Sequence, residues 1–191
     1  MKQVSLLLVL LTVTLTSFGQ KVFNVDKSHA RLGFTVTHAT LSEVDGNFKS
    51  FDATLKATKD DLSDATFELT GDVNSLNTDS EARDGDLKKE DFFNAAGFPK
   101  FSFKSTSISK VIGNQYKLAG QLTMKGVTLP VTLDLWMNGP VKNEMFKKNI
   151  VGIKALGKLN RVDFKIGAKM PGFIVGEEVA LRFVGEFNMP L

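Results

Sequence analysis

The chain of 191 residues contains no cysteine, which excludes disulfide bonds, thiol catalysis and lipid attachment through a cysteine. It has one Trp and one Tyr, and its 24 basic and 21 acidic residues are interspersed, so the features of a nucleic-acid-binding protein are missing. Its two histidines, His29 and His38, show no His-x-x-x-His spacing, and no carboxylate cluster completes a metal site, so we predict none. The whole chain is 42% hydrophobic and 24% charged, a composition typical of one medium-sized domain.

Motifs of catalysis are missing as well. The sequence has no Gly-x-Ser-x-Gly motif, no phosphate-binding loop and no dinucleotide-binding motif. Four acidic residues lie close together at positions 84, 86, 90 and 91, but no nucleophile accompanies them, so we interpret them as a solvated face. The sequence therefore predicts no enzyme, no catalytic residue and no cofactor apart from a bound lipid.

Three charged or titratable side chains have two interpretations each. His38 shares the apolar face of its strand, which favours a buried, hydrogen-bonded structural histidine at an end of the barrel over contact with the polar end of a ligand. Arg83 and Arg161 have acidic neighbours, among them Asp84 and Asp163, which favours structural ion pairs over ligand contact.

Residues 1–19 have the pattern of a secretory signal peptide. Lys2 precedes an apolar run over residues 4–15, and the small residues Ser17 and Gly19 precede the expected cleavage site before Gln20. The run is shorter than the ~20 apolar residues of a membrane-spanning helix and is broken by threonines. We therefore expect a single domain over residues 20–191, periplasmic or secreted, without stable insertion into a membrane.

The clearest structural signal is a β-hairpin over residues 115–137. A two-residue turn at Lys125 and Gly126 places Leu122 opposite Leu129 and brings every large apolar residue of both strands to one face. The other face pairs Thr123 with Thr128 and Lys117 with Asp134, as a solvated face favours.

Pro130 has no N–H but falls at a non-hydrogen-bonded site of this hairpin. Pro130 therefore cannot donate a hydrogen bond to the strand on its other side, and we expect a bulge or a weak edge there. Two strands with one apolar face are not stable alone and must curl around or stack on more sheet.

Apolar residues alternate with polar ones in the other extended segments too. These segments lie near residues 22–26, 30–38, 51–55, 65–73, 101–103, 151–159 and 179–187. Six or more such strands, with almost no helical period, predict an all-β antiparallel barrel or sandwich. Gly120, Ala155, Gly157 and Gly185 recur on inward faces, which favours a barrel with room for a bend or a ligand over a filled sandwich.

The remaining segments interrupt this pattern. Thr78 and Glu81 form a capping box and Gly85 is placed to end a helix, so we predict a short helix over residues 79–84 and a further turn over residues 88–92. We expect the hairpin to end at residues 138–140, a mobile polar loop over residues 141–149, and irregular chain over residues 162–173.

An ordered set of short motifs spans nearly the whole chain after residue 20. They are Asp26-x-x-His29 with Phe34 and His38, Gly46-x-Phe48, Arg83-Asp84-x-x-Leu87 with Asp91-Phe92-Phe93, Phe98-Pro99-x-Phe101-x-Phe103-x-Ser105-Thr106, Gly120-x-Leu122-Thr123-x-x-Gly126-Val127-Thr128-x-Pro130-Val131, and Arg161-x-Asp163-Phe164. In this order the motifs resemble the YceI-like, polyisoprenoid-binding proteins of bacterial periplasms. Ala30 and Asp86 stand where that family commonly has Ser and His.

The resemblance implies an extended, lipocalin-like antiparallel barrel of about eight strands with one short helix. It also implies an interior that takes a long isoprenoid, isoprenoid quinone or fatty chain, and the 16 Phe residues suit such a lining or an ordinary core. The predicted ligand-binding residues are Phe34, Val36, His38, Phe51, Phe67, Phe101, Phe103, Leu118, Gly120, Leu122, Val131, Leu133 and Phe183.

The leading hypothesis is therefore a binding protein that sequesters or carries a long-chain amphiphile. A lipid-modifying enzyme using His38 with a carboxylate is one alternative, and an envelope stress protein that acts through a protein partner is another. A homodimer is compatible with each of them.

Overall fold

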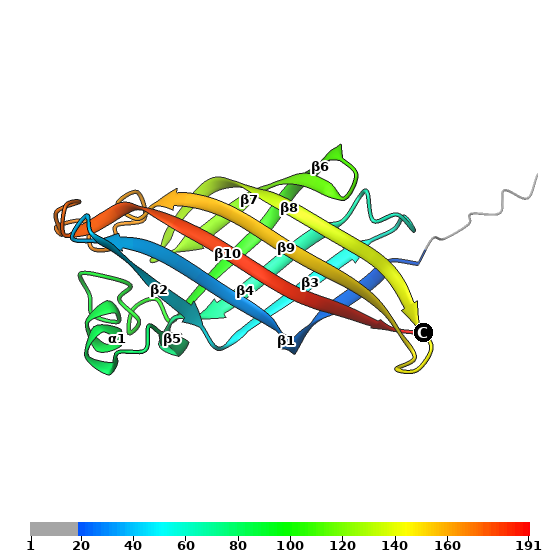
Figure 1. The fold of residues 1–191 in the computed structure, drawn as a ribbon, viewed down its shortest axis with the longest axis horizontal. Helices are drawn as coiled ribbons and strands as arrows, with labels where there is room; N and C mark the ends of the chain where they lie inside the picture. Colours follow the sequence, from blue (N-terminus) through cyan, green and yellow to red (C-terminus); the bar gives the residue numbers. More distant parts are fainter. Residues whose placement is uncertain (1–18) are drawn as a thin grey trace, which may run out of the picture.

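The computed structural model describes residues 19–191 and shows one antiparallel sheet that closes on itself into an elongated barrel (Figure 1). Sheet neighbours follow the order β10-β9-β8-β7-β6-β4-β3-β1, and β1 also pairs with β10, which closes a circuit of eight strands. The predicted all-β barrel is therefore confirmed. The predicted leader lies, apart from Gly19, outside the described residues.

The elements, in chain order, are β1 Lys21–His38, β2 Ser42–Phe48, β3 Phe51–Ala57, β4 Thr66–Asp72, the 3-10 helix η1 Val73–Ser75, β5 Leu76–Asn77, α1 Glu81–Leu87, β6 Lys100–Ile112, β7 Gln115–Met124, β8 Val127–Asn143, β9 Lys148–Asn160 and β10 Val175–Pro190. Among the described residues no helix is long and apolar enough to cross a membrane.

Strand β1 is long enough to have two neighbours along one edge. Residues 21–24 pair with β3 and residues 32–38 pair with β2, while the other edge pairs with β10. The two segments expected near residues 22–26 and 30–38 are thus one strand, interrupted in its pairing with β10 by a bulge between Val25 and Ala30. A bulge bends a strand without ending it, so one strand can follow the curvature of the barrel.

The two ends of the barrel differ (Figure 1). One end, called here the helix end, carries α1, the β1–β2 turn and the irregular residues 161–174 between β9 and β10. The opposite end, called the turn end, carries the β8–β9 turn at residues 144–147 and the C-terminus. The irregular chain predicted over residues 162–173 is confirmed.

The β7–β8 hairpin has the predicted register. Leu122 lies opposite Leu129, Thr123 donates to or accepts from Thr128 over 2.8 Å, and Lys117 forms an ion pair with Asp134. The turn residues Lys125 and Gly126 have φ values of 47° and 73°, the left-handed pair that a two-residue turn requires. The weak edge at Pro130 is also present, because the described pairs between β8 and β9 begin only at Asp134 and Leu156.

Two predictions about the ends of elements are wrong. The hairpin does not end at residues 138–140, because a bulge between Asn138 and Val141 absorbs Gly139 and Pro140 and β8 continues to Asn143. The expected mobile loop over residues 141–149 is therefore mostly strand, and only residues 144–147 form the turn.

The predicted helix boundaries are wrong as well. Helix α1 runs from Glu81 to Leu87, so Gly85 lies inside it, and its N-cap is Ser80, which makes no capping hydrogen bond through its side chain. Thr78 cannot cap the helix, because its N–H and hydroxyl both donate to the buried carboxylate of Asp84 over 2.8 Å and 2.6 Å. The turn expected over residues 88–92 is present, with the N–H of residue 92 donating to the carbonyl of residue 89.

We expect Gly126→Val to lower the free energy of unfolding by about 1–3 kcal/mol, because a β-branched side chain adopts positive φ only at a strain cost. A Cβ at Gly126 would also approach the ring of Phe98 to 2.7 Å. Lys125→Ala is the comparison. Alanine at position 125 keeps the same backbone φ, but the variant loses the hydrogen bonds that Nζ of Lys125 donates to the carbonyls of Glu90 and Lys165. Urea denaturation of both variants measures the difference, and equal losses would contradict the strain argument.

Candidate functional site

An apolar cavity of about 150 Å³ occupies the interior of the barrel toward the helix end. Its walls are aliphatic and Phe side chains, and only two lining residues, Arg161 and Arg182, carry a polar side chain. The lining consists of Leu32, Gly33, Phe34, Val36, Phe48, Phe67, Leu69, Leu87, Phe92, Phe93, Phe101, Phe103, Leu122, Met124, Val131, Leu133, Ala155, Leu159, Arg161, Ile166, Val175, Val179, Leu181, Arg182 and Phe183. A cavity with this lining suits an apolar guest and offers little to a polar one.

Glycines opposite Phe side chains shape the cavity. A Cβ added to Gly71 would lie 2.1 Å from the ring of Phe101, and one added to Gly120 would lie 2.4 Å from the ring of Phe103. The ring of Phe34 covers Gly46 in the same way, at 2.2 Å. Each ring therefore lies over a glycine and against the sheet, so the axis of the barrel stays open.

A cluster of Phe rings forms the floor of the cavity. Phe67 and Phe183 line the cavity and contact each other edge-on, with ring centroids 5.6 Å apart. Phe187, which is fully buried, packs under both at 5.5 Å and 5.9 Å, and Phe51 packs against Phe183 at 6.1 Å. The barrel is thus filled beyond these rings and hollow on the side of the helix end.

Half-buried lining side chains mark the open parts of the wall, and among the strands they lie on β1, β8, β9 and β10. Inward-facing side chains of β8 are half-buried from Val127 to Leu133, whereas Leu135 and Met137 further along the same strand are buried. This half-buried stretch coincides with the stretch that makes no described pair with β9. Solvent therefore reaches the cavity lining beside the gap in the β8–β9 ladder.

Arg161 fixes the irregular chain that borders the cavity. It is 3% exposed, and its five N–H groups donate to the backbone carbonyls of Gly176, Ile166, Gly167, Met170 and Val175. Burial lowers the pKa of this guanidinium, and the nearby Glu177 partly opposes that shift. Five carbonyl dipoles satisfy a buried guanidinium, so Arg161 holds the loop over residues 162–175 in one conformation.

The ion pairs predicted for the two arginines are not formed in the described chain. Arg161 bonds to carbonyls rather than to Asp163, which is exposed. Arg83 donates instead to Thr78, through Nε to the hydroxyl over 2.8 Å and through Nη2 to the carbonyl. Both guanidinium groups reach backbone carbonyls instead of carboxylates. The sequence does not predict these bonds, because it does not show in which direction the carbonyls of a loop point.

The structure gathers most of the predicted ligand-binding residues around the cavity. Nine of them belong to its lining, namely Phe34, Val36, Phe67, Phe101, Phe103, Leu122, Val131, Leu133 and Phe183. Leu118 and Phe51 lie in the filled part of the barrel, and the space over Gly120 is taken by the ring of Phe103. Ligand contact at all of these positions stays a prediction.

His38 lies at an end of the barrel, as predicted, but it is not the buried, hydrogen-bonded histidine that its strand pattern suggested. It is exposed at the last position of β1, where the strand leaves the barrel, and it does not line the cavity. Alternation predicts on which face of a strand a side chain lies, but it does not predict how exposed that side chain is at the end of the barrel.

Sequence reasoning missed several cavity residues. Val179 and Leu181 lie on the same alternating face of β10 as Phe183, so that alternation could have identified them. Phe92, Phe93 and Ile166 come from irregular chain at the helix end, where no period indicates direction.

The family model of the YceI-like domain matches residues 23–187. The chain belongs to the YceI-like family. A UPF0312 protein of Staphylococcus aureus (strain USA300) is 33% identical over 171 residues, which cover 87% of this chain and 97% of that protein. The two sequences thus correspond over nearly the full length of that relative.

Solved structures share the same YceI-like fold. Campylobacter jejuni YceI protein matches with a TM-score of 0.74 and 28% identity, over 81% of this chain and 90% of that one. Burkholderia cenocepacia BcnA matches with a TM-score of 0.76 and 22% identity, over 85% and 98%. A polyisoprenoid binding domain from Saccharophagus degradans matches with a TM-score of 0.66 and 14% identity, over 90% and 100%.

We expect Arg161→Lys to destabilise the protein by about 2–4 kcal/mol, because one ammonium group cannot satisfy carbonyls that the planar guanidinium reaches together. Asp163→Asn is the matched control and should leave stability unchanged, since Asp163 is exposed. Urea denaturation measures the stability, and limited proteolysis over residues 162–175 reports the loop. Equal effects of the two substitutions would instead indicate that Arg161 and Asp163 act as an ion pair.

Proposed function

We propose that this protein binds an amphiphile with a long apolar tail and holds the end of that tail in the barrel. The observation that carries the proposal is the cavity, whose lining is apolar apart from two arginines. Membership of the YceI-like family supports it, as does the fold shared with a domain described as polyisoprenoid binding. The proposed role is that of a carrier or store for a polyisoprenoid, an isoprenoid quinone or a fatty chain.

The size of the cavity bears on how the tail would be held. An apolar cavity of about 150 Å³ takes a guest of roughly six carbons, such as benzene. At about 0.8 kcal/mol for each buried CH₂, six carbons contribute about 5 kcal/mol, near the lower limit of the cost of association. A longer tail therefore needs either the open wall along β8 and β9 or a rotation of the Phe67 and Phe183 rings in the floor.

The gap in the β8–β9 ladder offers a route into the cavity. Pro130 has no N–H to donate toward β9, and no described pair joins the two strands between residues 127 and 133. Strand separation at this stretch breaks few backbone hydrogen bonds, because the ladder there is already interrupted. A tail would enter through the side wall at the helix end, and its polar head would stay near the rim.

The position of His38 does not support the alternative of a lipid-modifying enzyme. That alternative needs the imidazole beside a bound tail or head group, whereas His38 is exposed and does not line the cavity. Binding without chemistry is accordingly the function that we propose.

Leu133→Arg should weaken binding at least tenfold, because it places a charge in the apolar lining of the cavity. Thr132→Arg is the matched control on the same strand, since Thr132 is exposed on the outer face. Displacement of a fluorescent long-chain fatty acid and of a polyprenol analogue measures affinity, and thermal melting shows that both variants fold. Unchanged binding by folded Leu133→Arg would contradict the proposed site, and a native-host protein without extractable lipid would favour the partner-protein alternative.

We also propose that the protein acts outside the cytoplasmic membrane, in the periplasm or as a secreted protein. The support is the predicted signal peptide over residues 1–19, with its short apolar run broken by threonines. N-terminal sequencing of the protein from its native host should give Gln20 as the first residue. A chain that begins at Met1 would contradict this proposal and leave the cavity argument intact.

A further inference from the structure

The seam that closes the barrel contains a wide bulge. Strand β1 pairs with β10 at Val25 opposite Phe187, and the next described pair is Ala30 opposite Gly185. Residues 26–29 of β1 therefore face a single residue of β10, Glu186. Phe187 is buried inside the barrel, so its neighbour Glu186 points to the outer face, away from the apolar cavity.

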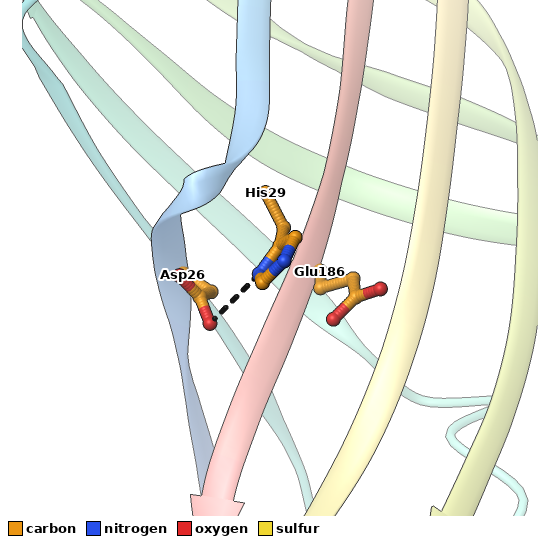
Figure 2. Close-up of side chains that lie close together, drawn as sticks. All are labelled: Asp26, His29 and Glu186. Atoms are coloured by element: carbon orange, nitrogen blue, oxygen red, sulfur yellow. Dashed lines mark ion pairs between the residues drawn. The ribbon is translucent and has the colours of Figure 1, made fainter.

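Three side chains with metal-binding atoms meet at this bulge. Ligand atoms of Asp26, His29 and Glu186 all lie within 4.8 Å of one another, and Nδ1 of His29 is 3.3 Å from Oδ2 of Asp26. Figure 2 shows the imidazole of His29 between the two carboxylates. The three residues line a hollow on the outer surface near the turn end, together with Asn143, Phe146, Lys148, Ile150 and Asn188.

Neighbouring groups hold the side chain of Asp26 in place. The N–H and hydroxyl of Ser28 donate to its Oδ1, and Nδ2 of Asn188 donates to its Oδ2 over 3.0 Å. These bonds fix the orientation of the carboxylate, as the second shell of a metal site does for its ligands.

An orphaned acceptor lies beside Asp26. Oδ1 of Asn188 is buried and has no hydrogen-bond partner, and it is the one side-chain nitrogen or oxygen atom of which this holds within residues 19–191. A buried acceptor without a donor is costly and points to a missing donor or cation. A water molecule bound to a metal ion in the hollow would supply that donor.

We propose that Asp26, His29 and Glu186 bind a divalent transition-metal ion of the Zn²⁺ type. One imidazole and two carboxylates suit zinc or its neighbours, whereas Mg²⁺ and Ca²⁺ prefer oxygen ligands throughout. Zinc ligands lie about 2.0–2.2 Å from the ion and so roughly 3.4 Å from each other, a spacing that a rotamer change of Glu186 can produce. The bound ion would fasten the bulge of β1 to β10, where backbone pairing is interrupted.

Lys148 lines the same hollow and carries a positive charge that competes with a metal ion. Lys148→Met should therefore tighten zinc binding. If Asp26 and His29 form only an ion pair, the protein should bind no zinc in the hollow, with or without this substitution.

Zinc titration of the untagged, chelator-treated protein tests the proposal, with binding measured by calorimetry and melting measured in parallel. We expect one zinc ion per chain, a rise in melting temperature that saturates with zinc, and no rise with Mg²⁺. His29→Ala and Glu186→Gln should each weaken zinc binding at least tenfold, while His38→Ala, which removes the only other histidine, should leave it unchanged.

Imidazole NMR separates this site from adventitious binding. With two histidines in the chain, the ring nitrogen signals are assignable by substitution, and zinc should shift those of His29 and not those of His38. An unshifted His29, or zinc affinity equal in the wild type, His29→Ala and Glu186→Gln, would overturn the proposal and leave the Asp26–His29 contact as an ion pair.

Discussion

Pairing between the first and the last strand is the interaction on which the rest of the molecule depends. Without the β1–β10 ladder the sheet would have two open edges and an apolar inner face exposed to water. When this ladder closes the barrel, the inward side chains of all eight strands point toward one axis, and a single core forms. The 18 residues of β1 make this possible, because one strand meets β10 along one edge and both β2 and β3 along the other.

The filled core and the cavity are separated along the barrel axis. Toward the turn end the interior is filled by buried residues such as Phe51, Leu118 and Phe187, which supply the apolar burial that holds the fold together. Toward the helix end the same inward faces enclose the cavity, and the chain there is held by polar contacts such as those of Arg161. A cavity costs dispersion contacts, so it is tolerated where other interactions fix the surrounding chain.

The sequence predicted the fold well where short-range rules determine it. The register of the β7–β8 hairpin followed from a turn at Lys125 and Gly126 and from alternation alone, and the structure has that register. The predictions were wrong where a side chain formed a different contact, or where a bulge let a strand continue. Thr78 donates to Asp84 rather than capping α1, and the bulge after Asn138 carries β8 past a Gly-Pro pair that usually ends a strand.

The sites were predicted less completely than the fold. Alternation identified Phe101, Phe103 and Leu133 as inward residues but could not tell at which height the barrel is hollow, so Leu118 was expected at the cavity and lies in the core. The cluster at the seam was out of reach for a different reason. Asp26 and Asn188 are 162 positions apart, and only the closure of the barrel brings the two ends of the chain together.

The rings that lie over glycines make the bore of the cavity sensitive to very small changes. At Gly46, Gly71 and Gly120 the only thing between the backbone and a Phe ring is a hydrogen atom, and a methyl group there would overlap the ring. Because the sheet cannot retreat, the ring would have to swing toward the axis. A single added carbon on the wall could therefore narrow the hollow, so relatives with the same strands can differ in the width of their cavities.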